Sequence, residues 1–223
     1  MRLHDLQRRI DAAAERAGRD PATVRLIAVS KGVDAARVDE AIAAGATELG
    51  ENRVQEAQSK RRDVAGVATW HLVGHLQRNK AKRAAELFDV VQSIDGERVA
   101  EALAAHRVAA HATALPVLIE VELTGIPARS GARPDAVAAL ARAIADLDGL
   151  RLMGLMTIAP PVSRAGDAAP HFRRVRELRD RLEQQLGRQL PQLSMGMSDD
   201  FEVAIAEGAT MVRVGRAIFG DRA

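Results

Sequence analysis

Lysine is scarce in this chain, and one of its four lysines stands where a side-chain amine could act as a nucleophile. Lys31 ends the apolar segment LIAVSK, whereas Lys60, Lys80 and Lys82 lie in polar helical patterns beside arginines, which is typical of solvated surface charges. A lysine that loses water at the end of an apolar strand favours its neutral amine, the form that attacks a carbonyl carbon. Lys31 is therefore a candidate for Schiff-base chemistry. The alternative is a lysine whose amine simply reaches out to solvent.

The C-terminal part of the chain has the composition of a phosphate site. Its two segments are LSMGMSDD (193–200) and TMVRVGRAIFG (210–220). Gly215 follows a predicted strand, so its backbone can approach an anion closely, and the amides of Gly215 and Arg216 would point toward a phosphate. Ser198 could add a hydroxyl donor from the preceding segment.

Arg213 stands at the end of the last predicted strand, and two interpretations of it are open. It could reach a ligand in the same site, or it could form a buried ion pair with Glu120 or Glu122 on a neighbouring strand. An aldehyde for Lys31 and a phosphate for the C-terminal segments could belong to one ligand. Pyridoxal phosphate carries both groups, and the sugar phosphate of a Schiff-base aldolase fits them as well.

Alternating strand and helix patterns indicate how distant segments could meet. Short apolar segments predict eight strands, at 25–30, 46–49, 70–74, 89–94, 116–122, 151–156, 191–195 and 210–213. Apolar spacings of three and four predict an amphipathic N-terminal helix and further helices at 34–44, 53–62, 79–87, 96–110, 134–147, 168–187 and 199–207.

This alternation predicts an α/β fold, a TIM-type (β/α)8 barrel with an extra N-terminal helix, as one domain over residues 1–223. Such barrels place active sites at the carboxyl ends of their strands and hold phosphate after strands seven and eight. An open doubly wound sheet is the alternative fold. No Gly-x-Gly-x-x-Gly segment or P-loop follows any strand, which disfavours its nucleotide-binding forms.

Composition bears on partners and location. Basic residues number 32 against 30 acidic ones and are interspersed with them, which gives little support to nucleic-acid binding. The chain has no cysteine, and its histidines have no partners at metal-ligand spacing, so we expect no metal site. No apolar stretch is long enough for a membrane span or suited to a secretory signal, and we expect a cytoplasmic protein.

Six ordered segments carry a resemblance to a known family: AVSK (28–31), GENRVQE (50–56), WHLVGHLQRNK (70–80), RLMGLM (151–156), SMGMSDDFEVAIAEGATMVRVG (194–215) and AIFG (217–220). By these segments the chain resembles the pyridoxal phosphate homeostasis proteins, which are related to the N-terminal barrel of alanine racemase. The resemblance implies that pyridoxal 5′-phosphate is bound as a Schiff base on Lys31, with Arg213 facing its pyridine nitrogen. It also implies that Ser198 and the amides of Gly215 and Arg216 contact the phosphate. Asn52, His71 and Met197 would line the pocket.

Three functions are compatible with such a site. The first, which the resemblance favours, is reversible binding of pyridoxal phosphate in vitamin B6 and amino-acid homeostasis, without efficient turnover and with cofactor-accepting apo-enzymes as partners. The second is an amino-acid racemase or decarboxylase, and the third is an aldolase. A two-base racemase needs an acid/base on each face of its substrate, and alanine racemase uses a tyrosine opposite its lysine. This chain has no tyrosine, although His71 or His75 could substitute. We expect a monomeric, non-enzymatic protein.

Overall fold

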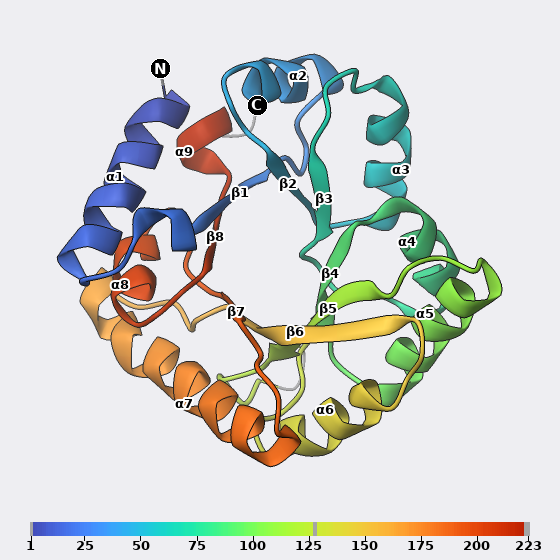
Figure 1. Cartoon of the computed structure of the whole chain (residues 1–223). Helices are drawn as coiled ribbons and strands as arrows, with labels where there is room; N and C mark the ends of the chain where they lie inside the picture. The colour runs from blue at the N-terminus through green and yellow to red at the C-terminus, as the bar shows by residue number, and fades with distance from the viewer. Residues whose placement is uncertain (1, 127–128, 221–223) are drawn as a thin grey trace.

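The computed structural model describes residues 2–126 and 129–220 and shows a closed barrel of parallel strands (Figure 1). Neighbours in the barrel follow the chain order, and the last strand pairs with the first. The strands are β1 (Arg25–Val29), β2 (Glu48–Glu51), β3 (Thr69–Leu72), β4 (Val90–Ile94), β5 (Leu115–Val121), β6 (Leu150–Thr157), β7 (Gln192–Ser194) and β8 (Met211–Val214). This confirms the predicted (β/α)8 barrel.

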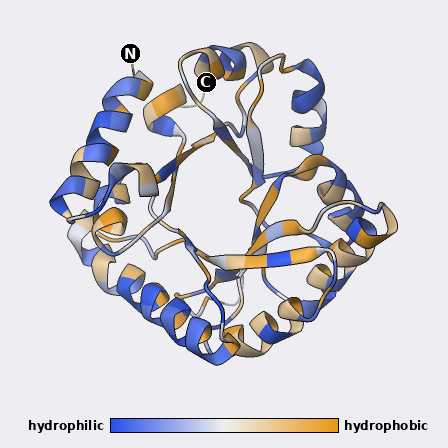
Figure 2. Ribbon diagram, in the orientation of Figure 1, coloured by the Kyte–Doolittle hydropathy of each residue, from blue (hydrophilic) through white to orange (hydrophobic). Residues whose placement is uncertain are grey.

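Helices surround the barrel on its outside (Figure 1). They are α1 (Arg2–Arg16), α2 (Ala35–Ala43), α3 (Val54–Asp63), α4 (Ala81–Leu87), α5 (Glu97–Ala109), α6 (Val137–Ala145), α7 (Ala169–Leu186), α8 (Phe201–Ala206) and α9 (Arg216–Phe219). The extra N-terminal helix α1 packs against α8 and α9. Hydrophilic residues predominate on α1 and α7, while hydrophobic residues gather in the strands (Figure 2). Within residues 2–126 and 129–220, no helix is long and apolar enough to cross a bilayer.

Several predicted elements differ from the structure in their boundaries, and β2 and α8 are examples. Strand β2 begins at Glu48 and continues to Glu51, because Gly50 pairs with Val29 on one side and His71 on the other despite its weak strand propensity. Helix α8 begins at Phe201 instead of residue 199. The start of α2 is fixed locally, because the Asp34 carboxylate caps the helix by accepting from the amide of Arg37 at 2.9 Å.

Candidate functional site

A cavity of about 440 Å³ opens at the carboxyl ends of the strands. It is lined by side chains and backbone from the first, second, third, sixth, seventh and eighth strand–helix connections: Val29, Lys31, Asn52, Val73, Ile158, Met197, Ser198, Asp199, Arg213, Gly215 and Arg216. Seven of the eight residues predicted for the cofactor are in this lining. The closed barrel thus brings Lys31 and the C-terminal segments together, although more than 160 residues separate them in the chain.

Lys31 lies in a tight turn directly after β1, and both of its neighbours are held. The Ser30 hydroxyl donates to Oε1 of Glu51 at 2.6 Å, and the Gly32 amide donates to Oε1 of Glu56 at 2.5 Å. Gly32 has a φ of 71°, in the left-handed region that glycine adopts without steric cost. The turn that presents Lys31 to the cavity is therefore fixed by side chains from β2 and α3.

Lys60 completes this arrangement, and its interpretation as a surface charge is wrong. Its side chain is 6% exposed. Nζ donates to the carbonyl of Ser30 at 2.6 Å, to Oε1 of Glu51 at 2.5 Å and to Oε1 of Glu56 at 3.1 Å. The polar stretch of α3 concealed this position, because the face of α3 that bears Lys60 packs toward the barrel instead of solvent. Lys60 is a second buried lysine beside the candidate nucleophile.

Glu51 is the acceptor shared by Ser30 and Lys60 at the end of β2, and it is fully buried. Burial raises the pKa of its carboxyl, and the contacts with Lys60 and Ser30 offset this only in part. The hydrogen bonds of Glu51 therefore support the turn that carries Lys31.

Arg213 enters the cavity from β8 and is 5% exposed. Its guanidinium donates to the Ser194 hydroxyl and to the carbonyl of Thr157, both at 2.7 Å. No ion pair within 4 Å joins it to Glu120 or Glu122 in the described residues, so that alternative is wrong. Burial lowers the pKa of Arg213 to about 10, and the more distant charges of Glu120 and Asp200 oppose this. At neutral pH Arg213 is therefore still a cation.

The phosphate-like part of the cavity lies where β8 passes into α9. A Cβ on Gly215 would lie 3.0 Å from the carbonyl oxygen of Val29, so glycine permits this turn to sit against β1. The first amides of a helix have no partner inside it and are available to an anion. Ser198 adds a hydroxyl to the lining, and the Arg216 guanidinium pairs with Asp199 at the edge. Only the backbone of Arg216 is therefore expected to face an anion.

The loop before α8 is shaped by the carboxylate of Asp200. The Asp200 side chain makes no cap contact with α8 and instead accepts from the amide of Met197 at 2.6 Å. Burial raises the pKa of Asp200. The closed loop presents Met197, which is 39% exposed, at the opening of the cavity.

His71 and Asn52 were both predicted to line the pocket, and the structure separates them. Asn52 lines the cavity, with its backbone so close to Gly74 that a Cβ there would lie 2.3 Å from the Asn52 carbonyl oxygen. His71 is fully buried inside the barrel and is absent from the lining. Its ring nitrogens lie 2.9 Å from Gln92 and 2.9 Å from Glu48. The strand alternation that turns His71 inward also places it below the cavity floor.

The arrangement suits a ligand that carries a carbonyl group at one end and a phosphate at the other. Lys31 supplies an amine, the start of α9 with Ser198 supplies anion donors, and Arg213 supplies a cation that its hydrogen bonds hold in place. Val29, Val73 and Ile158 give the cavity apolar walls, which sequence reasoning did not assign. These residues fit pyridoxal phosphate by the chemistry of their donors.

Comparisons with known proteins agree with this geometry. Residues 1–223 match the family described as the alanine racemase N-terminal domain. The pyridoxal phosphate homeostasis protein of Pseudomonas aeruginosa is 46% identical over 215 residues, spanning 96% of this chain and 91% of that protein. The protein of the same name from Aquifex aeolicus is 39% identical, spanning 99% and 97% respectively. The structure of PipY from Synechococcus elongatus, with pyridoxal phosphate bound, is 38% identical with a TM-score of 0.84, covering 95% of this chain and 100% of that one. The chain therefore belongs to the pyridoxal phosphate homeostasis proteins, within the family of the alanine racemase N-terminal domain.

Proposed function

We propose that this protein binds pyridoxal 5′-phosphate reversibly as a Schiff base on Lys31, and that it serves vitamin B6 and amino-acid homeostasis without efficient turnover. The observation that carries the proposal is the meeting of Lys31, Arg213, Ser198 and Gly215 in one cavity. The relatives named above support it, since two bear this function in their names and one holds this cofactor. Release to an acceptor amine, including that of an apo-enzyme, would reverse the bond.

Two features of the cavity argue for holding the cofactor instead of catalysis. Pyridoxal phosphate supplies an electron sink when its ring nitrogen is protonated. Arg213 is a hydrogen-bonded cation at neutral pH, so it would donate to that nitrogen and keep it unprotonated. Among the described lining residues, none is a histidine or tyrosine that could act as the second acid/base of a racemase.

The two histidines considered as substitutes are engaged elsewhere. His71 lies below the cavity between Gln92 and Glu48. His75 has its Nδ1 atom 2.9 Å from Asp95, beside neighbouring cavities. Both positions support a binding role over a two-base mechanism.

The test is a visible absorption spectrum of the purified protein with pyridoxal phosphate, before and after borohydride reduction, followed by peptide mapping. We expect an absorption band that reduction converts to a stable adduct on Lys31. Lys31→Ala should abolish that adduct, whereas Lys82→Ala, which alters an exposed lysine of α4, should keep it. Failure of the wild-type protein to form any adduct would overturn the binding proposal.

A second assay separates holding from catalysis. Single enantiomers of alanine are incubated with the loaded protein, and optical rotation is followed against free cofactor at the same concentration. We expect no excess over free cofactor. Racemisation well above that background and lost in Lys31→Ala would contradict the non-catalytic part of the proposal.

A further inference from the structure

A line of polar side chains runs through the barrel from the cavity to its opposite end. The Arg213 guanidinium donates to Oγ of Ser194 at 2.7 Å, and that hydroxyl donates to Oε1 of Gln92 at 2.6 Å. Nε2 of Gln92 lies 2.9 Å from Nδ1 of His71. Nε2 of His71 lies 2.9 Å from Oε2 of Glu48. Five residues thus form one continuous chain of contacts.

These residues come from strands that are far apart around the barrel. Ser194 is on β7 and Gln92 is on β4, and neither strand is next to the other. Their contact must therefore cross the barrel interior. Gln92, His71 and Ser194 are fully buried, so no water competes for their hydrogen bonds.

The direction of every hydrogen bond follows from the arginine. A guanidinium can only donate, so Ser194 accepts from Arg213 and must turn its own proton toward Gln92. The Gln92 amide oxygen is then the acceptor, and its NH2 group faces Nδ1 of His71. Nδ1 accepts, so Nε2 carries the ring proton, and it lies 2.9 Å from Oε2 of Glu48 in a close contact that does not meet hydrogen-bond geometry. The three hydrogen bonds from Arg213 to His71 therefore point the same way, and they end at a ring beside the carboxylate of Glu48.

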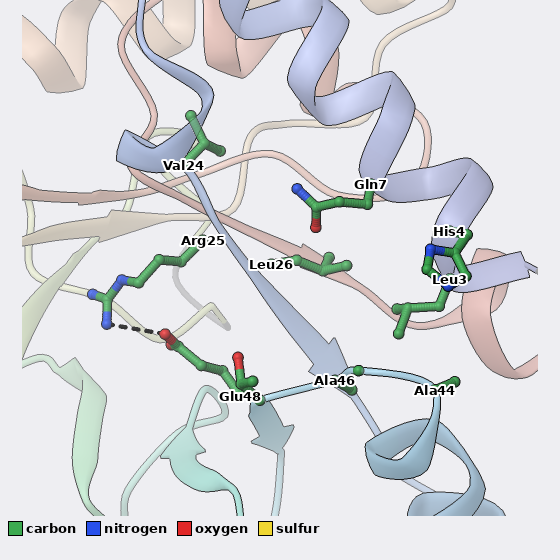
Figure 3. Close-up of a pocket in the computed structure, with 11 residues that line it drawn as sticks. Leu3, His4, Gln7, Val24, Arg25, Leu26, Ala44, Ala46 and Glu48 are labelled. Carbon is green, nitrogen blue, oxygen red and sulfur yellow. Dashed lines mark hydrogen bonds and ion pairs between the residues drawn. The ribbon is translucent and has the colours of Figure 1, made fainter.

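The far end of the line lies at the amino ends of the strands, in a separate cavity of about 300 Å³ (Figure 3). Arg25 and Glu48 both line it, and NH1 of Arg25 lies 3.2 Å from Oε1 of Glu48. Burial raises the pKa of Glu48, but His71 and Arg25 outweigh this effect and hold it below its ordinary value. A negative charge is therefore kept at the end of the line opposite Arg213.

We propose that Ser194, Gln92, His71 and Glu48 are positioning residues for Arg213, and that they couple the Arg25–Glu48 pair at the amino ends of the strands to the group that faces the cofactor ring. The part of this inference that concerns the cofactor rests on the proposed function, whereas the coupling between Glu48 and Arg213 does not. Once Arg213 is fixed, the donor and acceptor roles of Ser194, Gln92 and His71 follow in turn. We therefore expect a change at Glu48 to reach the hydrogen bonds of Arg213 without contacting it.

The coupling is tested first in the cofactor-free protein by nitrogen-15 NMR of the His71 ring and the Arg213 guanidinium. We expect wild-type His71 to carry its proton on Nε2. Glu48→Gln should shift the signals of both His71 and Arg213, and in a Gln92→Met background it should shift His71 alone. Gln7→Ala alters the same cavity outside the line and should shift neither. If Glu48→Gln does not fold, Arg25→Gln perturbs the same carboxylate from its exposed side.

An unmoved Arg213 signal in Glu48→Gln, or a shift that persists with Gln92→Met, would overturn the coupling. The second readout is the rate at which loaded protein gives up pyridoxal phosphate to excess hydroxylamine. If Glu48→Gln weakens the hold on Arg213 by about the worth of one hydrogen bond, the release rate should rise about fivefold. Substitutions at sites without contact normally act additively, so Glu48→Gln should still speed release about fivefold in the Gln92→Met background if the two sites are independent. If the line carries the effect of Glu48→Gln on release, that effect should fall below about twofold in this background.

The two readouts keep the two proposals distinguishable. A wild-type protein that takes up no pyridoxal phosphate would refute the proposed function, while the NMR experiment would still decide the coupling. Coupled NMR signals with equal release rates in all variants would show that the line does not position Arg213 for the cofactor, and would overturn that part of the inference.

Discussion

Replacing Lys60 with methionine tests whether the turn that carries Lys31 depends on a buried charge. Methionine keeps most of the apolar stem of the side chain and removes the ammonium group. Three acceptors then lose their donor: the Ser30 carbonyl at 2.6 Å, Glu51 at 2.5 Å and Glu56 at 3.1 Å. The fully buried carboxyl of Glu51 is left without its cation.

The magnitude follows from that unpaired group. Removing one partner of a buried ion pair costs about 3–5 kcal/mol of unfolding free energy. Burial already raises the pKa of Glu51, so the carboxyl can take up a proton and relieve part of the cost. We therefore expect Lys60→Met to lower the free energy of unfolding by about 3 kcal/mol. For a chain of this size that corresponds to a fall in Tm of about 6–12 °C.

Urea unfolding followed by the fluorescence of Trp70 measures this directly, since Trp70 is the only tryptophan and is 3% exposed. Lys82→Met on the exposed face of α4 is the matched control and should stay within about 0.5 kcal/mol of wild type. Lys60→Met with Glu51→Gln should recover part of the loss, because the carboxylate is gone. A single variant Lys60→Met as stable as Lys82→Met would refute the reasoning.

Three further outcomes are expected. Partial burial raises the pKa of Glu56, but the Gly32 amide and a nearby ammonium outweigh this and hold it below its ordinary value. The ionised Glu56 carboxyl therefore stabilises the fold fully above about pH 4.5, and this stabilisation is lost as pH falls through the lowered pKa. In a plot of the urea unfolding midpoint against pH, Glu56→Gln should lose stability less steeply than wild type on the acid side, and parallel curves for the two proteins would contradict this. Burial raises the pKa of Glu120, so the stability of wild type relative to Glu120→Gln should fall as pH rises from 4.5, and a constant difference would count against it. A Cβ on Gly154 would lie 1.8 Å from the carbonyl oxygen of Gln192, so Gly154→Ala should cost more than about 3 kcal/mol, and a thermal scan close to wild type would disprove that clash.

The fold was readable from the sequence because each strand–helix unit carries its own local signal. Apolar segments predicted all eight strands, and apolar spacings of three and four predicted the helices between them. The bounds of β2 were wrong because partners distant in the chain decide them. Gly50 and Glu51 are strand residues because β1 and β3 pair with Gly50 and β3 pairs with Glu51.

The meeting of Lys31, Ser198 and Gly215 was predictable because each lies in a connection that follows a strand. A barrel gathers such connections at one end. The burial of Lys60 and of His71 was not predicted, and the reason is the same for both. Their partners lie on other elements, so neither hydropathy nor spacing within α3 or β3 reveals that both are buried in a polar network. The sequence alone did not decide whether Lys60, four residues after GENRVQE, is buried or exposed, because that depends on which face of α3 packs on the barrel.

The same network bears on whether the protein holds its cofactor or transforms a substrate. A general acid or base must exchange protons with the ligand while it reacts. Around Lys31 the buried carboxyl of Glu51 is held by Lys60 and Ser30. The carboxylate of Asp199 pairs with Arg216, but both of these side chains are exposed, and such surface pairs contribute little. The hydrogen bonds of Glu51 fix the shape of the Lys31 turn, so a catalyst derived from this cavity would first have to free that carboxyl from its structural partners.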